Sequence, residues 1–403
     1  MASRIVPVLL LSLAAGIAGC GDSDQSPTSP AVEPAVAAAT SPLSFKIVGT
    51  GSFFACGITT DNRAFCWGDN ADGQLGDGTR IDHPRPAEVK RGLRYLDLSA
   101  GDSHACGVGT DSLVYCWGLN SHGQLGDGTL GHRLTPAKVG SRHYKQVTAG
   151  ALHTCAVTAA NKVYCWGFNA LGQLGDNTTT QRLLPVAVAG SVRFRRISSG
   201  GVHTCGVTAA NRAYCWGDNT LHELGDGSDA ALRLIPTAVA TGLTFRQISA
   251  GGGHTCGIAQ DQRAYCWGFN ETGQLGNGDV NPVATPHLVT GGLTFNTLAA
   301  GGDYTCGVTT GHAAFCWGGN FTSKLGDGTG VNARLKPTAV VGGLSFSGVD
   351  PGAYSTCGVT TGKRAYCWGH NGQGQLGDGR TDGPDQCTGI PCSKKPEAVV
   401  GPS

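Results

Sequence analysis

The 403-residue sequence has little charge, since Asp, Glu, Lys and Arg make up only 14% of it. A typical soluble domain carries about 25% charged residues. The 29 basic residues nearly balance the 28 acidic ones, which argues against the strongly basic character of a nucleic-acid-binding domain. Glycine is abundant, at 65 residues, but it follows no Gly-X-Y period, and 40% of the residues are hydrophobic. These features exclude collagen and a disordered chain, and we expect no nucleic-acid partner.

Long apolar runs are also scarce, and the one at the N-terminus, Ile5–Ile17, is too short to cross a bilayer as a mature helix. Arg4 precedes this run, and small residues lead from it to Cys20. That arrangement resembles a bacterial lipoprotein signal, in which residues 1–19 are removed and Cys20 is lipidated. The alternative is an ordinary secretory leader with an incidental Cys20. Residues 20–43 are rich in Ser, Pro, Ala and Thr, which is typical of a flexible tether. We expect an exported protein of the bacterial cell envelope, held at the outer membrane or cell surface by lipid alone.

The remaining sequence, residues 44–403, is one unit repeated seven times. Each unit contains one tryptophan, at intervals of 49 to 51 residues: Trp67, Trp117, Trp166, Trp216, Trp267, Trp317 and Trp368. Each tryptophan lies in Cys-Trp-Gly-x-Asn, followed by a glycine-rich stretch and then by Pro-x-x-Val. The segments are short, rich in β-branched or aromatic residues, and bounded by Gly, Pro, Asn or Asp, as in four-stranded blades. A period near fifty residues indicates a propeller or a solenoid, and seven units with the pattern of four-stranded blades favour an all-β, seven-bladed β-propeller.

Paired cysteines predict the strand register within each repeat, because nine residues separate the two members of every pair. The pairs are Cys56 with Cys66, Cys106 with Cys116, Cys155 with Cys165, Cys205 with Cys215, Cys256 with Cys266, Cys306 with Cys316, and Cys357 with Cys367. If the first pair is opposed in a hairpin, Ile58 faces Ala64 on one side of the sheet and Gly57 faces Phe65 on the other. All seven repeats give equivalent pairs, and a tiny residue beside an aromatic ring is a favourable cross-strand partner.

Cysteines opposed in this way lie within disulfide distance, and their spacing lacks the two-to-four-residue interval of zinc ligands. We therefore predict one disulfide per blade and an eighth, between Cys387 and Cys392, in the last repeat. With Cys20 these assignments account for all 17 cysteines.

Ring closure can also be predicted. We expect the Pro-x-x-Val strand to come before the other three strands of a blade in blades two to seven. The segment from Pro396 to Val400 would then be left over at the C-terminus. The simplest closure pairs that segment with the first blade, which begins at Leu43.

The phrase Cys-Trp-Gly-x-Asn-x-x-Gly-Gln-Leu-Gly-Asp-Gly-Thr, with an upstream Ala-Gly-x-x-His, resembles the regulator of chromosome condensation repeat. The resemblance covers residues 44–403 and implies a seven-bladed propeller. The family's best-known activity is nucleotide exchange on a small GTPase with chromatin docking. That activity is not expected here, because the chain has a lipoprotein-like leader, cysteines in both central strands and no basic tail. The chain is also similar to a secreted bacterial β-lactamase-inhibiting propeller, which binds its target through loops on one face.

Recurring polar residues raise the question of catalysis. Histidines occupy one position in four repeats, His104, His153, His203 and His254, while Phe54, Tyr304 and Ser355 hold it in the others. A ring of imidazoles can bind a metal, but hydrogen bonds to neighbouring blades are the favoured interpretation. The Asp of Leu-Gly-Asp-Gly is replaced by Asn277 in one repeat, which fits a turn residue better than a general acid. The sequence contains no nucleophile elbow, phosphate loop or zincin motif. We expect no enzyme activity, no cofactor and no metal.

Departures from the repeat are the candidate binding residues. They are His222 and Glu223 in the fourth repeat, Ser323 and Lys324 in the sixth, and Asp382, Asp385, Lys394 and Lys395 in the seventh. Variable loops on a rigid frame usually carry binding specificity, although neutral drift of surface loops gives the same pattern. We therefore predict a monomeric scaffold that binds a protein or another cell-surface macromolecule through one face. The alternative is an extracellular enzyme that acts on glycans or peptides at the central axis.

Overall fold

The computed structural model describes residues 43–402, which form 29 β-strands and no helix. The expected leader over residues 1–19, the lipidation site at Cys20 and the tether up to residue 42 lie outside the described residues. Within residues 43–402, no helix of the length and apolarity needed for a membrane crossing is present.

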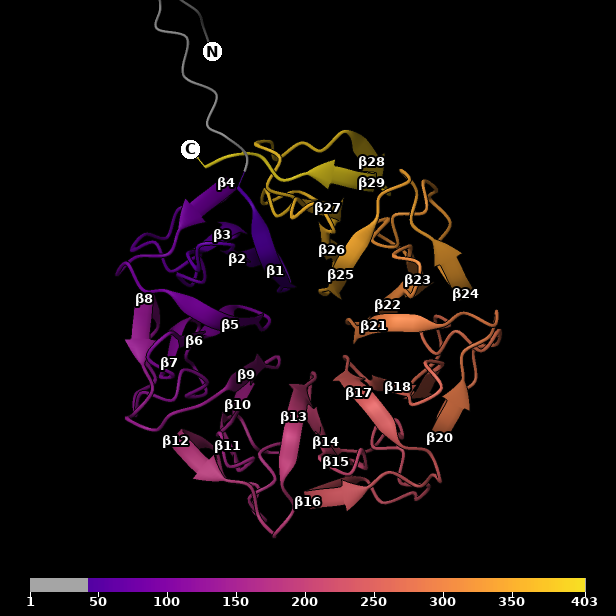
Figure 1. Ribbon diagram of the computed structural model, residues 1–403. Coiled ribbons are helices and arrows are strands. Elements are labelled where there is room, and N and C mark those ends of the chain that lie inside the picture. The colour runs from indigo at the N-terminus through magenta and orange to yellow at the C-terminus, as the bar shows by residue number, and fades with distance from the viewer. Residues whose placement is uncertain (1–42, 403) are drawn as a thin grey trace, which may run out of the picture. The chain divides into compact units, whose positions relative to one another are not determined.

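The strands form seven antiparallel sheets, one from each repeat, and Figure 1 shows them as blades around a central axis. The inner strands are β1 (Phe45–Thr50), β5 (Tyr95–Ala100), β9 (Gln146–Ala149), β13 (Phe194–Ser199), β17 (Phe245–Ala250), β21 (Phe295–Ala300) and β25 (Phe346–Pro351). The second strands are β2 (Phe54–Thr59), β6 (His104–Gly109), β10 (His153–Val157), β14 (His203–Thr208), β18 (His254–Ala259), β22 (Tyr304–Thr309) and β26 (Ser355–Thr360). The third strands are β3 (Ala64–Gly68), β7 (Val114–Gly118), β11 (Val163–Gly167), β15 (Ala213–Asp218), β19 (Ala264–Gly268), β23 (Ala314–Gly319) and β27 (Ala365–His370). The outer strands are β4 (His83–Glu88), β8 (Arg133–Lys138), β12 (Arg182–Ala187), β16 (Leu232–Ala238), β20 (Val283–Leu288), β24 (Ala333–Ala339) and β29 (Ile390–Ala398), and β28 (Asp385–Cys387) adds a fifth strand to the last sheet. The predicted seven-bladed, all-β propeller is confirmed.

The predicted hairpin register is also confirmed. Cys56 lies opposite Cys66, and Gly57 lies opposite Phe65; the other six blades have the same register. The space that a Cβ at Gly57 would need is filled by the ring of Phe45, 2.6 Å away on the inner strand. Glycine is therefore needed at this position so that the inner strand can pack closely.

All eight predicted disulfides are present. In each blade one disulfide joins the second strand to the third, with Cα atoms 4.0–4.1 Å apart. Cys56 is bonded to Cys66, Cys106 to Cys116, Cys155 to Cys165, Cys205 to Cys215, Cys256 to Cys266, Cys306 to Cys316, and Cys357 to Cys367. The eighth disulfide, between Cys387 and Cys392, closes the β28–β29 hairpin of the last blade. Every cysteine that the structure describes is therefore bonded to the partner that its spacing predicted.

The hydrophobic core lies between adjacent blades rather than within one blade. Cys56 and Cys66 of the first blade pack in one cluster with Tyr95 and Trp117 of the second. The indole Nε1 of Trp117 donates a hydrogen bond of 2.9 Å to the carbonyl oxygen of Gln74, in the loop of the first blade. Corresponding bonds join Trp67 to Gln375, Trp166 to Gln124, Trp216 to Gln173, Trp267 to Glu223 and Trp317 to Gln274. Each tryptophan is thus a packing residue under the loop of the preceding blade.

The predicted strand order at the ring closure is wrong. The strand that carries Pro396, β29, pairs with β27 of its own blade rather than with the first blade. In the first repeat, too, the Pro-x-x-Val strand β4 follows the tryptophan strand and pairs with it. The reason is local: the loop over residues 69–82 folds back on itself, so the chain returns to the edge of the same sheet.

The ring closes through hydrogen bonds and packing between the last and first blades. The backbone N–H of Thr50 donates to Oδ2 of Asp350 at 2.6 Å, and the Thr50 hydroxyl donates to the Asp350 carbonyl at 2.9 Å. Trp67 donates to the carbonyl of Gln375, as the equivalent tryptophans do at five other junctions. No strand is exchanged between blades in the described part of the chain.

The antiparallel topology gives the propeller two distinct faces. The turns between inner and second strands, such as 51–53, and the loops between third and outer strands, such as 69–82, open on one side. We call this side the loop face. The turns between second and third strands, such as 60–63, and the connections to the next blade, such as 89–94, open on the other side, the hairpin face.

Candidate binding face

A collar of seven glycines surrounds the axis on the loop face. Each comes directly after the last residue of an inner strand: Gly51, Gly101, Gly150, Gly200, Gly251, Gly301 and Gly352. A Cβ at any of them would lie only 2.2–2.7 Å from the carbonyl oxygen of the next glycine around the ring. Because no side chain fits at such a distance, the glycines let seven backbones meet. The collar surrounds a funnel of about 320 Å³.

The funnel offers few functional side chains. Ser52, Asp102 and Tyr354 contribute to its lining, which is otherwise mostly glycine and alanine. The Ser52 hydroxyl donates to Oδ1 of Asp102 at 3.1 Å, and burial raises the pKa of Asp102. No group of three or more His, Cys, Asp or Glu side chains suited to a metal ion occurs in the part of the chain that the structure describes.

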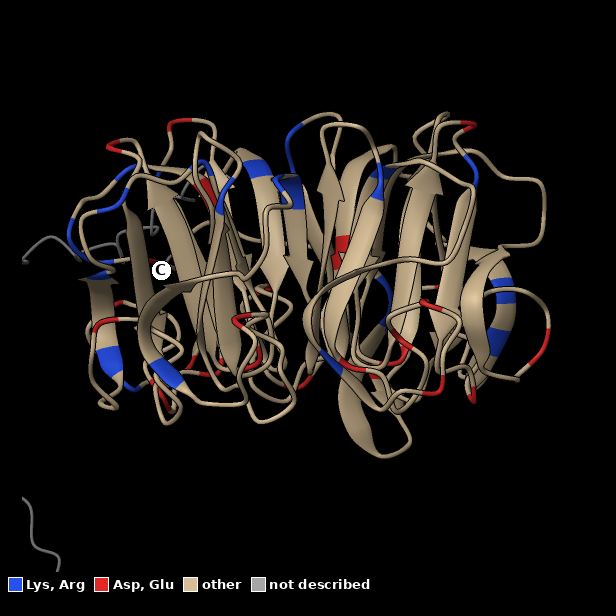
Figure 2. Cartoon of the chain, turned by 90° about the horizontal axis from the view of Figure 1, so that it is seen from below, with Lys and Arg blue, Asp and Glu red and all other residues tan. Residues whose placement is uncertain are grey.

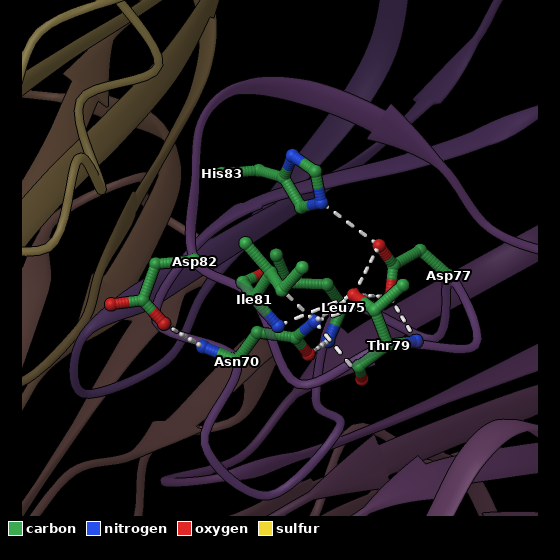
Figure 3. Close-up of polar contacts among 7 residues, drawn as sticks. All are labelled: Asn70, Leu75, Asp77, Thr79, Ile81, Asp82 and His83. Carbon is green, nitrogen blue, oxygen red and sulfur yellow. Dashed lines mark hydrogen bonds and ion pairs between the residues drawn. The ribbon is translucent and has the colours of Figure 1, made fainter.

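The loops beside the funnel are held by an internal polar network, drawn for the first repeat in Figure 3. The Asn70 amide Nδ2 donates to the carbonyl of Ile81 at 3.0 Å, and its Oδ1 accepts from the N–H of Leu75 at 3.0 Å. Oδ1 of Asp77 accepts from the Thr79 N–H at 2.9 Å. Burial alone would raise the pKa of Asp77, but hydrogen bonds from Thr79 and Asn70 outweigh it and lower that pKa. The repeated aspartate is thus a turn residue, as the sequence predicted.

The recurring histidines join neighbouring blades, which confirms the favoured interpretation. Nε2 of His153 lies 2.9 Å from the Thr204 hydroxyl oxygen, and that hydroxyl donates to the Gln173 carbonyl at 2.9 Å. Because the Thr204 hydroxyl donates its only hydrogen to the Gln173 carbonyl, it can only accept from His153, so Nε2 of His153 carries a hydrogen. Burial lowers the pKa of His153 to about 3, which keeps the ring neutral. The equivalent pairs are His104–Thr154, His203–Thr255, His254–Thr305 and Tyr304–Thr356.

Two junctions lack this link, and both partners differ there. Where the histidine position holds Phe54, the next blade has Ala105 instead of threonine, and where it holds Ser355, the next blade has Ala55. All four residues are buried. The hydrogen-bonded pair is therefore absent as a whole at these two junctions, although the Ser355 hydroxyl stays buried there without a hydrogen-bond partner.

The candidate binding residues of the fourth and sixth repeats are mostly buried. Glu223 and Ser323 are 0% and 1% exposed, and Lys324 is 4% exposed. Lys324 forms an ion pair with Asp303 and donates to the Ala353 carbonyl at 3.0 Å. Burial, together with a smaller contribution from the nearby Asp218, raises the pKa of Glu223 to about 7. These side chains shape the loops from within rather than presenting themselves to a partner, while His222 is half-buried.

Three of the seventh-repeat residues, Asp385, Lys394 and Lys395, lie on a disulfide-bonded hairpin formed by β28 and β29, which packs against the sixth-repeat loop. The fourth, Asp382, lies in the loop just before β28. Asp382 and Lys395 are exposed, and Asp385 and Lys394 are half-buried. Oδ2 of Asp385 accepts from the Lys394 N–H at 3.0 Å. The Lys394 carbonyl accepts from the N–H of Gly328, in the sixth-repeat loop, at 2.9 Å. The structure thus brings the sixth- and seventh-repeat candidates together, and those of the fourth repeat lie elsewhere on the ring.

An exposed aromatic group, missed at the sequence level, lies next to this hairpin. The rings of Phe53 and Tyr354 stack with centroids 4.7 Å apart, and His370 contacts Phe53 edge-on. Phe321 is 52% exposed and Tyr354 is 41% exposed. The neighbouring Thr322 hydroxyl donates to the Tyr354 carbonyl at 2.7 Å, which joins the two loops. We call Phe53, Phe321, Tyr354 and His370 the aromatic sector; Phe321 and Tyr354 are exposed, Phe53 is half-buried and His370 is buried. A signal was available for Phe321, because the other six repeats have a small or polar residue there.

The architecture and the loops together define a class of protein: a disulfide-bonded propeller of regular repeats with one asymmetric, loop-bearing face. Residues 14–307 of the sequence match the RCC1-like domain, and residues 349–375 match the Regulator of chromosome condensation (RCC1) repeat. The chain belongs to the RCC1-like domain family, as its repeated motif predicted. No curated protein matches the sequence at a significant level.

Solved structures with the same fold come from distant relatives. Prp20p of Saccharomyces cerevisiae, whose structural study concerns its binding to Gsp1p and histones, is 22% identical with a TM-score of 0.69, over 76% of this chain and 80% of its own. Human WBSCR16 is 20% identical with a TM-score of 0.73, over 79% and 88%. The ectodomain of the Physcomitrella patens receptor kinase CR4 is 28% identical with a TM-score of 0.53, over 81% and 74%.

Proposed function

We propose that this protein is an exported lipoprotein of the bacterial cell envelope that binds another protein through the aromatic sector of its loop face. The observation that carries the proposal is that the main departures from the sevenfold repeat lie in three adjacent blades. The exposed rings, the extra disulfide-bonded hairpin and the ring closure all occur in the sixth, seventh and first blades. Exposed aromatic residues on a rigid frame are the usual anchors of protein interfaces.

Two further observations support this function. Relatives of the fold bind proteins, as the study of Prp20p with Gsp1p and histones indicates, and the CR4 relative is a receptor ectodomain. Eight disulfides fit an oxidising compartment outside the cytosol. Nucleotide exchange on a small GTPase is not proposed, because the expected export signal leads away from the cytosol.

Photocrosslinking in intact cells tests the binding face. A photoreactive amino acid replaces Tyr354 in one strain, and in a control strain it replaces Leu184, which is 59% exposed on the outer strand of the third blade. Irradiation is expected to give a discrete protein adduct from position 354 and none from position 184. Adducts of equal yield from both positions, or none from position 354, would contradict the proposed face.

Metabolic labelling tests the anchor separately. Cells fed radioactive palmitate are expected to label the native chain but not the Cys20→Ser variant. If both forms carry equal label, or neither does, the proposed lipidation is wrong.

An extracellular enzyme remains the competing function, since the funnel holds the hydrogen-bonded pair Ser52 and Asp102. Turnover of a screened glycan or peptide, abolished by Asp102→Asn and unaffected at the aromatic sector, would favour it over the scaffold.

A further inference from the structure

The nearly neutral net charge conceals a strong separation of charge between the two faces. The turns and blade connections of the hairpin face contain twelve Lys or Arg and three Asp, with no Glu. The turns and loops of the loop face contain sixteen Asp or Glu and three Lys or Arg. In Figure 2 many basic residues and a few acidic ones lie along the upper edge of the propeller, whereas most acidic residues lie in its lower half, together with some basic ones.

The acidic residues that do occur on the hairpin face already have local partners. Asp61 pairs with Arg63, Asp261 pairs with Arg263, and Asp111 accepts a hydrogen bond from the Tyr115 hydroxyl. Asp61 and Asp261 therefore neutralise basic residues of their own turns. Asp111 is hydrogen-bonded to a neutral hydroxyl and keeps its charge beside the connection 89–94, where the N–H of Thr110 donates to the Arg94 carbonyl at 2.8 Å. The six basic residues of the connections outnumber this one carboxylate.

The basic residues of the connections are concentrated in one arc of the ring. All six charged residues of the blade connections are basic, and they lie in the connections 89–94, 139–145 and 188–193. No charged residue occurs in the other three connections, 239–244, 289–294 and 340–345. We call the six the basic arc: Lys90, Arg91, Arg94, Arg142, Lys145 and Arg193. All are exposed, and the arc contains no acidic residue.

The arc continues inward along the start of β13. Arg195 and Arg196 line a hollow of about 400 Å³ together with Lys145, Leu96 and Asp97. Asp97 is the one acidic side chain in that lining, and its Oδ2 accepts from the N–H of Val147 at 3.0 Å. The hollow therefore presents more positive than negative groups to solvent.

The chain enters the domain on this same face. The N–H of Phe45, at the start of β1, donates to the carbonyl of Lys363 at 2.8 Å, and Lys363 lies in a turn of the hairpin face. The described part of the chain therefore begins on the basic side of the propeller, and in the sequence 22 residues separate Cys20 from residue 43.

From these observations we propose that the hairpin face docks on an anionic lipid surface through the basic arc. The inference rests on the proposed lipid anchor for its biological setting, since a lipid on Cys20 would hold this face near the headgroups. A basic patch adds a second attachment signal to that of a lipid anchor. Docking in this way turns the aromatic sector, on the opposite face, away from the membrane toward a partner.

Vesicle binding of the mature chain, residues 20–403, carrying Cys20→Ser isolates this contact from both the lipid anchor and the apolar leader. The probe is a vesicle containing phosphatidylcholine with about 30% phosphatidylglycerol, compared with pure phosphatidylcholine. Each basic residue near an anionic surface contributes about fivefold to binding. Lys90→Glu/Arg91→Glu/Arg94→Glu is therefore expected to weaken binding to the anionic vesicle at least ~100-fold. High salt, near 1 M, should also abolish binding, because charge interactions then extend only about 3 Å.

The matched control reverses three exposed charges away from the hairpin face: Arg80→Glu/Lys336→Glu/Lys395→Glu. It changes the net charge equally and should leave vesicle binding within about threefold of the parent. Urea denaturation of both triple variants verifies that each remains folded.

Three results would overturn the proposal: no binding of the Cys20→Ser chain to anionic vesicles, equal losses in both triple variants, or binding to duplex DNA in preference to vesicles. None of them bears on palmitate labelling of Cys20, so failure of the docking face and failure of the proposed anchor are distinguishable.

Discussion

Replacing Thr204 with alanine tests how the blades are joined. The Thr204 hydroxyl accepts from Nε2 of His153 and donates to the Gln173 carbonyl. In Thr204→Ala the carbonyl keeps its bond from Trp216 at 3.0 Å, but the buried imidazole N–H loses its acceptor. An unpaired buried donor costs about 1–3 kcal/mol, and loss of the buried methyl group adds about 1 kcal/mol. The free energy of unfolding should therefore fall by about 2–4 kcal/mol.

The double variant His153→Phe/Thr204→Ala should be more stable than Thr204→Ala alone. It reproduces the natural junction of Phe54 with Ala105, where no polar group is left unpaired. Its total cost should stay below about 1.5 kcal/mol, in the range of a volume-conserving core change. The double variant should thus be at least about 0.5 kcal/mol more stable than Thr204→Ala alone, and the two substitutions should couple by more than that amount, as contacting residues do.

Urea denaturation with intact disulfides, followed by tryptophan fluorescence, gives the four unfolding free energies of this cycle. A change in midpoint at constant slope would report stability alone. If the two single-variant costs add within about 0.5 kcal/mol, the histidine and threonine act independently and the explanation of the paired exchange is refuted.

Three further predictions concern the collar, the disulfides and the ring closure. Gly200→Ala places a Cβ 2.4 Å from the Gly251 carbonyl oxygen and should lower the free energy of unfolding by about 1–3 kcal/mol, measured by urea denaturation. The control Gly242→Ala, where the Cβ meets no atom within 4 Å, should not destabilise the protein. Equal effects of the two substitutions would disprove the role of the collar. Reduction of the hairpin disulfides should lower the melting temperature by at least about 10 °C, since closing each short loop contributes roughly 2–3 kcal/mol, and an unchanged melt would disprove their contribution. Burial raises the pKa of Asp350 to about 7, so its neutral form is favoured in the fold. Stability should fall as pH rises from about 4 to 7, and this fall should be smaller in Asp350→Asn, whose amide oxygen can still accept from Thr50; the same slope in both proteins would contradict the assignment.

The repeat and register could be predicted from sequence because each blade carries two cysteines at a fixed spacing. One register then places Gly57 opposite Phe65 and Ile58 opposite Ala64, and seven copies of the pattern reinforce it. The order of the strands could not be predicted in this way, since a periodic sequence has no marked beginning. Hydrogen bonds such as Asn70 to Ile81 decide it, because they fold the loop back to its own blade.

The candidate site was only partly predictable for a similar reason. The variable loops of the sixth and seventh repeats were found, but burial of Lys324 depends on Asp303, which lies 21 residues earlier. The stacking of Phe53 on Tyr354 joins residues at opposite ends of the domain, and it follows only from the way the ring closes. The separation of charge was hidden because the chain alternates between the two faces within each repeat, so its net charge stays near zero.

Crosslinking from both faces of the native, anchored protein tests the central claim most directly. A photoreactive amino acid replaces either Arg91, on the hairpin face, or Tyr354, on the loop face, and cells are irradiated intact. The account predicts lipid adducts from position 91 and a discrete protein adduct from position 354. Protein adducts from position 91 together with lipid adducts from position 354 would contradict the proposed orientation and the binding face at once.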